Sequence, residues 1–232
     1  MNDLTQVEYD YLVRPTTCEP DDFWGQVRRT VNGKPVSQEQ IDAIICAVKA
    51  GLQLKQDDVL LDIGCGNGAL ASYLFDSVHA YLGVDMSTCL IDVARKYFER
   101  APSFRFSLQG AAEYVIAEEH PSHFTKALCY GTFAYFSPNE AKDVLSAMHS
   151  RFSSVRTFFI GNLPDAEKAD AFFAGRDALP LDDCTTAIGK WYARAEFTEL
   201  ASSCGWDVGY TVMPKDFYGA HYRFDATLAR KA

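Results

Sequence analysis

The chain has 232 residues, of which 48% are hydrophobic and 23% charged, and this composition fits one globular domain with a large core. Its formal net charge of −9 argues against a nucleic-acid substrate, because neutralising phosphate groups requires a surface rich in lysine and arginine. The seven cysteines are scattered, odd in number and without a Cys-x-x-Cys pair, which is typical of buried thiols in a reducing compartment.

The first segment with an unusual composition covers residues 23–34, which are dense in aromatic and polar groups. One interpretation is a lid over a binding site, in which Arg29 pairs with a bound carboxylate. The other is a helix that packs Phe23 and Trp24 on the edge of a sheet and leaves its arginines in solvent. Both interpretations remain open from the sequence alone.

Predicted helices and strands then alternate along the chain in the manner of a doubly wound α/β sheet. Apolar residues at helical or alternating spacing mark these elements. Helices are expected over residues 41–54, 69–75 and 87–99, with Ser87 as the N-cap of the last one. Strands are expected over residues 59–63, 80–84, 104–108, 126–130, 155–160, 206–213 and 222–229.

The strand over residues 59–63 runs directly into Gly64, Gly66 and Gly68, three glycines at alternate positions. Glycine permits a positive φ, and it lets a ligand approach the backbone where a Cβ would hold the ligand away. This strand end therefore predicts a tight loop against a nucleotide-like ligand.

The next strand, residues 80–84, ends at Asp85, whose carboxylate is well placed to bind a ribose diol. The glycine loop with Ala69 and Asp85 also satisfies the dinucleotide fingerprint. Asp62 argues against a dinucleotide, because a carboxylate beside a pyrophosphate costs on the order of 1–4 kcal/mol. S-adenosylmethionine carries an ammonium and a sulfonium and no phosphate, so it suits Asp62 better.

Two motifs stand at these strand ends: Asp62-x-Gly64-x-Gly66-x-Gly68 and Gly83-Val84-Asp85-Met86-Ser87. The pair resembles the motifs of the class I S-adenosylmethionine-dependent methyltransferases, here of the small-molecule type. The resemblance implies a Rossmann-like α/β sheet of seven strands in the order 3-2-1-4-5-7-6, with the last strand antiparallel. It also implies a single domain over residues 1–232 with a helical lid over residues 1–55. The implied cofactor is S-adenosylmethionine, which leaves as S-adenosylhomocysteine.

By this resemblance, cofactor contacts are expected from the lid, the glycine loop, the strand ends and the turns that follow later strands. These residues are Arg29, Asp62, Gly64, Cys65, Gly66, Asn67, Gly68, Asp85, Met86, Leu90, Gly110, Ala111, Ala112, Tyr130 and Tyr135. Family members often carry an acidic residue at the position of Ala111 to bind the adenine amino group. Adenine is therefore expected here to be held by backbone groups and packing, unless this segment is a plain turn between a strand and a helix.

The methyl acceptor is expected to be a small polar metabolite. The aromatic loop after residues 126–130 resembles that of small-molecule methyltransferases and lacks the Asn/Asp-Pro-Pro-Tyr motif of enzymes that methylate nucleobases or glutamine amides. Residues 161–192 form a long insertion that predicts either a cover over the acceptor or a dimer arm. Its first turn, at residues 162–165, is similar to one in methyltransferases of surface-polysaccharide pathways, which favours a sugar or sugar-derived acceptor.

Methyl transfer to oxygen or nitrogen proceeds by in-line displacement, so positioning and desolvation contribute much of the rate. An oxygen acceptor usually also needs a base within hydrogen-bond reach. The candidates are His221, which precedes the last strand, Asp165 and Tyr130. No carboxylate directly follows residues 126–130, where metal-dependent catechol-type enzymes place one, so no metal is expected.

Residues 1–5 are polar and no apolar run approaches about 18 residues, so neither a signal peptide nor a membrane span is expected. The protein is expected to be cytoplasmic, to bind a small acceptor rather than a nucleic acid or a membrane, and to be a monomer or homodimer. Two alternatives remain: a module that binds S-adenosylmethionine without catalysis, and an NAD-dependent oxidoreductase.

Overall fold

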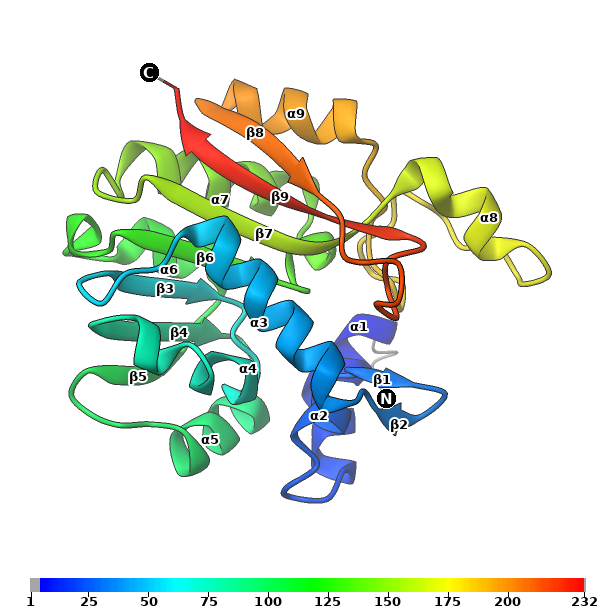
Figure 1. The fold of residues 1–232 in the computed structure, drawn as a ribbon, viewed down its shortest axis with the longest axis horizontal. Helices are drawn as coiled ribbons and strands as arrows, with labels where there is room; N and C mark the ends of the chain where they lie inside the picture. The colour runs from blue at the N-terminus through cyan, green and yellow to red at the C-terminus, as the bar shows by residue number, and fades with distance from the viewer. Residues whose placement is uncertain (1–4, 232) are drawn as a thin grey trace.

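The computed structural model describes residues 5–231, and its centre is a seven-stranded sheet in the order β5-β4-β3-β6-β7-β9-β8 (Figure 1). The strands are β3 (Val59–Ile63), β4 (Ala80–Asp85), β5 (Phe104–Leu108), β6 (Lys126–Tyr130), β7 (Thr157–Pro164), β8 (Trp206–Thr211) and β9 (Arg223–Arg230). β9 runs antiparallel to both of its neighbours, whereas the pairs from β5 to β7 are parallel. This order and the antiparallel last strand confirm the expected Rossmann-like methyltransferase sheet. The polar start of the chain, on which the expectation of no signal peptide partly rests, lies outside the described residues.

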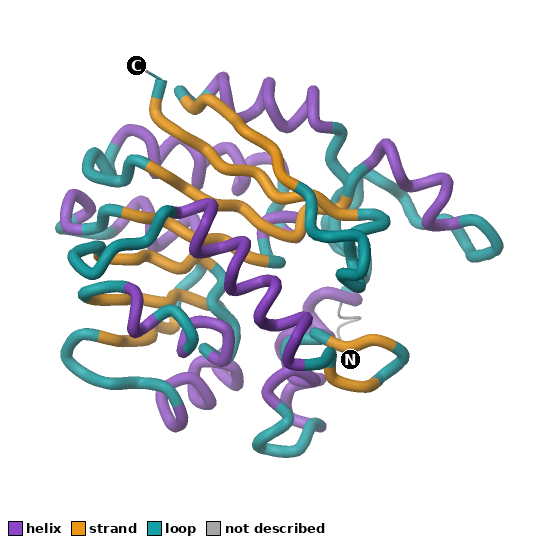
Figure 2. The backbone as a smooth tube through the Cα atoms, in the orientation of Figure 1, coloured by secondary structure: helices purple, strands orange, loops and turns teal. Residues whose placement is uncertain are grey.

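Helices cover both faces of the sheet (Figure 2). On one face lie α3 (Gln38–Leu52), α4 (Ala69–Ser72) and α5 (Thr88–Tyr97), and on the other lie α6 (Ala111–Ala117), α7 (Pro138–Ser150) and α9 (Arg194–Ser203). Each face has its own hydrophobic core, because the buried strands present apolar side chains in both directions. Within residues 5–231, no helix has the length and apolar character needed to cross a membrane.

The three predicted helices are present in the structure, and each ends two or three residues earlier than expected. In α3, buried residues recur at helical spacing (Ile41, Ile44, Ile45, Val48 and Leu52). The Ser87 hydroxyl accepts a hydrogen bond from the Leu90 amide and caps α5 as expected. The helix expected over residues 69–75 ends at Ser72, and a 3₁₀ turn, η3 (Phe75–Ser77), completes the connection to β4.

The fifth strand extends further than the sequence predicts. A strand ending at residue 160 was expected, followed by a turn at residues 162–165, but β7 continues to Pro164. A bulge interrupts its pairing with β9 between Ile160 and Leu163, after which Leu163 pairs with Phe224. The strand is longer than predicted because β9, which is distant in sequence, supplies the pairing partner that keeps this stretch extended.

Two segments lie at the carboxyl ends of the strands (Figure 1). The N-terminal segment contains α1 (Gln6–Glu8), a π-helix η1 (Tyr9–Val13), a 3₁₀ turn η2 (Arg14–Thr17), α2 (Phe23–Gln26) and a hairpin of β1 (Thr30–Val31) and β2 (Lys34–Pro35). The insertion after β7 contains η6 (Ala166–Lys168) and α8 (Ala169–Phe173), followed by a long loop to α9. Two short 3₁₀ turns, η4 (Pro121–His123) and η5 (Phe133–Tyr135), flank β6.

Candidate active site

The glycine loop joins β3 to α4 and adopts a conformation that side chains resist. Gly64, Gly66 and Gly68 have φ angles of +74°, +58° and +77°. A Cβ on Gly64 would lie 2.3 Å from the side chain of Thr132, and one on Gly68 would lie 2.7 Å from the ring of Phe106. These positions therefore need glycine for two reasons: the backbone has a positive φ, and the neighbouring side chains leave no room for a Cβ.

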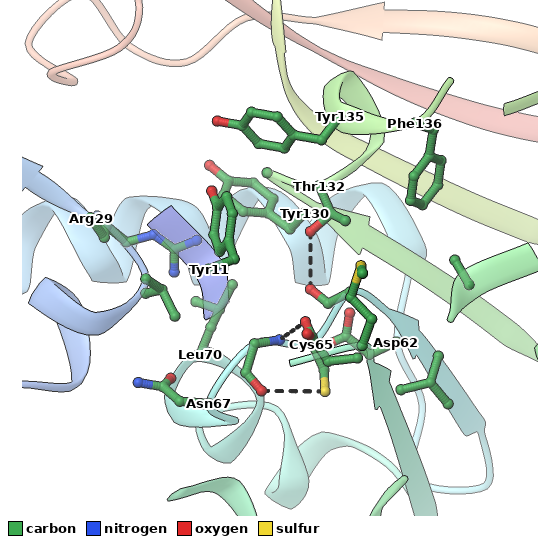
Figure 3. Close-up of a pocket in the computed structure, with 18 of the residues that line it drawn as sticks. Tyr11, Arg29, Asp62, Cys65, Asn67, Leu70, Tyr130, Thr132, Tyr135 and Phe136 are labelled. Carbon is green, nitrogen blue, oxygen red and sulfur yellow. Dashed lines mark hydrogen bonds between the residues drawn. The ribbon is translucent and has the colours of Figure 1, made fainter. Parts of the chain in front are cut away.

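A cavity of about 220 Å³ opens beside this loop, at the point where strand order reverses in the sheet. Of the residues expected to contact the cofactor, eleven line it: Arg29, Asp62, Gly64, Cys65, Gly66, Asn67, Asp85, Met86, Ala111, Tyr130 and Tyr135. Gly110 and Ala112 line a second hollow that shares Met86 with the first. Gly68 and Leu90 lie outside both linings. Figure 3 shows the labelled residues arranged around the first cavity.

Two carboxylates, the buried Asp62 and the half-buried Asp85, form the sheet side of the cavity. Asp85 accepts hydrogen bonds from the amides of Gly66 and Ser87, each at 2.9 Å. Asp62 is 4% exposed and accepts a hydrogen bond from the Tyr81 hydroxyl at 2.9 Å. Burial raises the pKa of both carboxyls, and for Asp62 it raises the pKa to about 7, with the charge of Asp85 adding to the effect.

Arg29 faces these carboxylates from the N-terminal segment. Its guanidinium lies 5.6 Å from the ring centre of Trp24 and 5.3 Å from that of Tyr130, so two aromatic faces support it. Among residues 5–231, the ion pairs do not include Arg29, whereas the neighbouring Arg28 pairs with buried Asp10. The cavity therefore has a positive group on one wall and negative groups on the other.

Asn67 of the glycine loop also makes hydrogen bonds to the N-terminal segment. Its amide nitrogen donates to the carbonyl oxygen of Phe23 at 2.8 Å and to the Gln26 side chain at 2.9 Å. The Ser87 hydroxyl likewise donates to the carbonyl oxygen of Tyr11 at 2.6 Å. The glycine loop and the start of α5 thus hold the N-terminal segment against the cavity.

The N-terminal segment supplies cavity residues that the sequence analysis did not select. Tyr11 and Leu12 line the cavity, and the Tyr11 ring packs edge-on against Tyr135 at 5.4 Å (Figure 3). These residues lie in a π-helix with no sequence signal that sets it apart. Thr132 also lines the cavity, and its hydroxyl donates to the Gly64 carbonyl at 3.1 Å.

The three candidate bases lie in different surroundings. Tyr130 lines the cavity, whereas Asp165 and His221 do not. Asp165 is 1% exposed, caps η6 by accepting from the Glu167 amide, and lies 3.4 Å from Arg194. The exposed His221 stacks on Phe172 of the insertion. No group of three or more His, Cys, Asp and Glu side chains in the described part of the chain is arranged to hold a metal ion.

Residues 60–153 match the family of the methyltransferase domain. No curated protein sequence matches the chain.

Solved structures share the fold at low sequence identity. Magnesium protoporphyrin IX methyltransferase from Synechocystis PCC 6803, solved with S-adenosylhomocysteine, has a TM-score of 0.59 and 16% identity, covering 84% of this chain and 83% of its own. The 1,6-didemethyltoxoflavin N1-methyltransferase from Burkholderia thailandensis has a TM-score of 0.60 and 17% identity, with coverages of 84% and 80%. The small RNA methyltransferase HEN1 has a TM-score of 0.63 and 18% identity, covering 85% of this chain and 26% of its own.

These three proteins act on different kinds of substrate, and their likeness to this chain is a likeness of fold. The matched domain contains the glycine loop, Asp62 and Asp85, and the sheet around it has the strand order that the motifs imply. Residues 60–153 therefore form a methyltransferase domain, and the sheet around them has the fold of the class I S-adenosylmethionine-dependent methyltransferases.

Proposed function

We propose that this protein transfers the methyl group of S-adenosylmethionine to an oxygen or nitrogen atom of a small polar metabolite. The observation that supports this most strongly is the charge arrangement around the cavity. Asp62 and Asp85 lie on its sheet side and Arg29 lies on its N-terminal side. S-adenosylmethionine presents an ammonium, a carboxylate and a ribose diol, and these groups complement the three side chains.

In this proposal each polar group of the cofactor has one partner. Asp85 accepts hydrogen bonds from the ribose hydroxyls, Asp62 pairs with the ammonium and Arg29 pairs with the carboxylate. Met86 and Ala111 pack against adenine, since Met86 belongs to both hollows. A dinucleotide fits less well, because its pyrophosphate would stand near Asp62 in the glycine loop.

The cofactor supplies an electrophilic methyl group, and the chain supplies position and a dry environment. We propose that the N-terminal segment is the lid, since Tyr11 and Leu12 cover the cavity and three hydrogen bonds from Asn67 and Ser87 hold the segment in place. Excluding water strengthens every electrostatic contact within the site. The insertion after β7 is proposed as the cover on the acceptor side, because the Tyr135 hydroxyl and Arg28 both donate to its Ala187 carbonyl.

A small acceptor is favoured over RNA by the net charge of −9 and by the covered cavity. Among the proteins of the same fold, one acts on 1,6-didemethyltoxoflavin and another on small RNA, so the fold leaves the acceptor open. The sequence of residues 162–165, at the end of β7, is similar to one in methyltransferases of surface-polysaccharide pathways, which supports a sugar or a sugar-derived compound within the small-molecule class.

The test is the release of S-adenosylhomocysteine from S-adenosylmethionine in the presence of two sets of acceptors. One set contains glucose, myo-inositol, glucosamine and ethanolamine, and the other contains single- and double-stranded RNA oligonucleotides. We expect turnover with at least one small acceptor and none with RNA, and loss of that turnover in Asp85→Ala. Methylation of RNA alone would contradict the small-molecule assignment, and cofactor binding without turnover would support a non-catalytic module.

A further inference from the structure

The bulge in β7 lies next to Tyr130, which lines the cofactor cavity. Gly161 pairs with Tyr130 across the sheet, and a Cβ on Gly161 would lie 2.3 Å from the Tyr130 ring. The next residue, Asn162, has a φ of +66°, in the left-handed region that asparagine adopts more readily than other residues apart from glycine. Bulges of this kind commonly re-aim side chains next to active sites.

Opposite the bulge, β9 contributes a buried carboxylate. Asp225 is 2% exposed, and its Oδ1 accepts a hydrogen bond from the backbone amide of Asn162 at 2.7 Å. Its Oδ2, the Oδ1 of Asn162 and the hydroxyl of Tyr130 are all buried, and none has a hydrogen-bond partner among residues 5–231. Buried polar atoms in proteins are nearly always paired, so three unpaired ones in neighbouring residues require partners from outside the chain, either water or a ligand.

This polar cluster of Tyr130, Asn162 and Asp225 adjoins the cofactor cavity. Tyr130 and its neighbour Gly131 line the cavity, whereas Asn162 and Asp225 lie next to these residues and outside the lining. A Cβ built on Gly131 would lie 3.4 Å from the side-chain nitrogen of Asn162 and 3.9 Å from a guanidinium nitrogen of Arg29. The side-chain amide of Asn162 and the guanidinium of Arg29 therefore both lie close to Gly131.

Asp225 is not neutralised by a salt bridge within the described residues. The nearby guanidinium of Arg223 donates to the backbone oxygen of Asn162 instead. Burial raises the pKa of Asp225 to about 6, while the positive charge of Arg223 opposes this rise. The carboxyl is thus ionised at neutral pH and close enough to its pKa to take up a proton.

We propose that the polar cluster binds the methyl acceptor, and that Asp225 removes the acceptor's proton; this rests on the function proposed above. Two of the unpaired atoms are hydrogen-bond acceptors, and the third is a hydroxyl that can donate or accept. They suit a group that donates two or more hydrogen bonds: adjacent hydroxyls of a polyol, or a primary amine.

The reaction balances with these groups. The acceptor oxygen or nitrogen forms a bond to the methyl carbon, and the carbon–sulfur bond breaks with its electron pair going to sulfur. The proton of the acceptor passes to Oδ2 of Asp225, which later releases it to solvent. Several charged or titratable groups surround the site of this proton transfer. They are Arg223 and Asp225 of β9, Tyr130 of β6, Tyr218 of the loop between β8 and β9, and Arg29 of the N-terminal segment.

The experiment uses the 232-residue chain saturated with S-adenosylhomocysteine and measures probe binding by saturation-transfer NMR. The probes are myo-inositol and glucose in one arm, and glucosamine and ethanolamine in the other. Asp225→Asn keeps the shape of the side chain, and its side-chain oxygen can still accept the hydrogen bond from the backbone amide of Asn162. Asp207→Asn, at an exposed position on β8, is the matched control, and Tyr130→Phe removes only the unpaired hydroxyl.

We expect probes of at least one arm to bind wild type and Asp207→Asn, and to bind Asp225→Asn and Tyr130→Phe at least tenfold more weakly. With S-adenosylmethionine, a bound probe should be methylated at least 100-fold more slowly by Asp225→Asn, with S-adenosylhomocysteine affinity unchanged within twofold. The proposal is overturned if no probe binds the wild type, if Asp225→Asn binds like the wild type, or if it methylates within threefold of the wild-type rate. Failure of the wild type to bind S-adenosylhomocysteine would instead contradict the proposed function.

Discussion

Gly64→Ala is expected to destabilise the protein by about 2 to 4 kcal/mol and to abolish cofactor binding. The new Cβ would lie 2.3 Å from the Thr132 methyl group and 2.5 Å from its hydroxyl oxygen. Thr132 cannot turn away without losing its hydrogen bond to the Gly64 carbonyl. The left-handed φ of +74° adds a backbone cost that alanine bears and glycine does not.

Gly33→Ala is the matched control for this effect. Gly33 has a φ of +75°, and no atom lies within 4 Å of its ideal Cβ position, so the substitution carries the backbone cost without the clash. We expect it to lower the free energy of unfolding by about 1 kcal/mol and to leave cofactor affinity intact. Urea denaturation of both variants measures the difference, and equal losses would show that contact with Thr132 contributes nothing.

Asp62→Asn is expected to stabilise the free protein by about 3 kcal/mol at pH 7.5. Burial raises the pKa of Asp62 from 3.8 to about 7, so the folded state binds more protons than the unfolded state between these values. The cost of burying the carboxylate therefore grows as pH rises from about 4 to 7 and is complete above 7. Asparagine keeps the hydrogen bond from Tyr81 and avoids that cost, so its advantage should vanish near pH 4.

The same substitution should weaken S-adenosylmethionine binding by about 10- to 100-fold, because an amide cannot pair with the ammonium. In the wild type, lowering the pH from 7.5 to 5.5 protonates Asp62 and should weaken binding by roughly 20-fold. In Asp62→Asn this pH dependence should be largely absent. Denaturant unfolding and calorimetric titration at several pH values measure both effects, and a variant that is less stable at pH 7.5 would contradict the account.

Much of the fold follows from local sequence patterns. The glycine loop and the apolar runs of β3 and β4 define one half of the sheet, and β6 adds a further continuous apolar run. The order of the outer strands came from family resemblance, since periodicity alone does not determine which strands pair. The extension of β7 past Ile160 could not be predicted, because it depends on pairing with β9, about 60 residues later.

The site was predictable where it lies next to the glycine motif and less so elsewhere. Residues near the motif are positioned by one loop and two strand ends, so chain proximity suffices to bring Asp62 and Asp85 together. Tyr11 lines the cavity, and Asp225 belongs to the polar cluster of Tyr130, Asn162 and Asp225. They come from opposite ends of the chain, and only the tertiary fold brings them to these places. Asp165 was predicted as a candidate base because it follows a strand. In the structure it caps η6 and pairs with Arg194, and these contacts explain its position.

The central claim is that this cavity binds S-adenosylmethionine with Asp85 holding the ribose. The most direct measurement is calorimetric titration of S-adenosylmethionine, S-adenosylhomocysteine and NAD into the wild type and Asp85→Ala. We predict that both adenosyl compounds bind the wild type, that NAD does not, and that Asp85→Ala binds the adenosyl compounds at least 50-fold more weakly. Binding of NAD, or of none of the three, would contradict the assignment of this cavity.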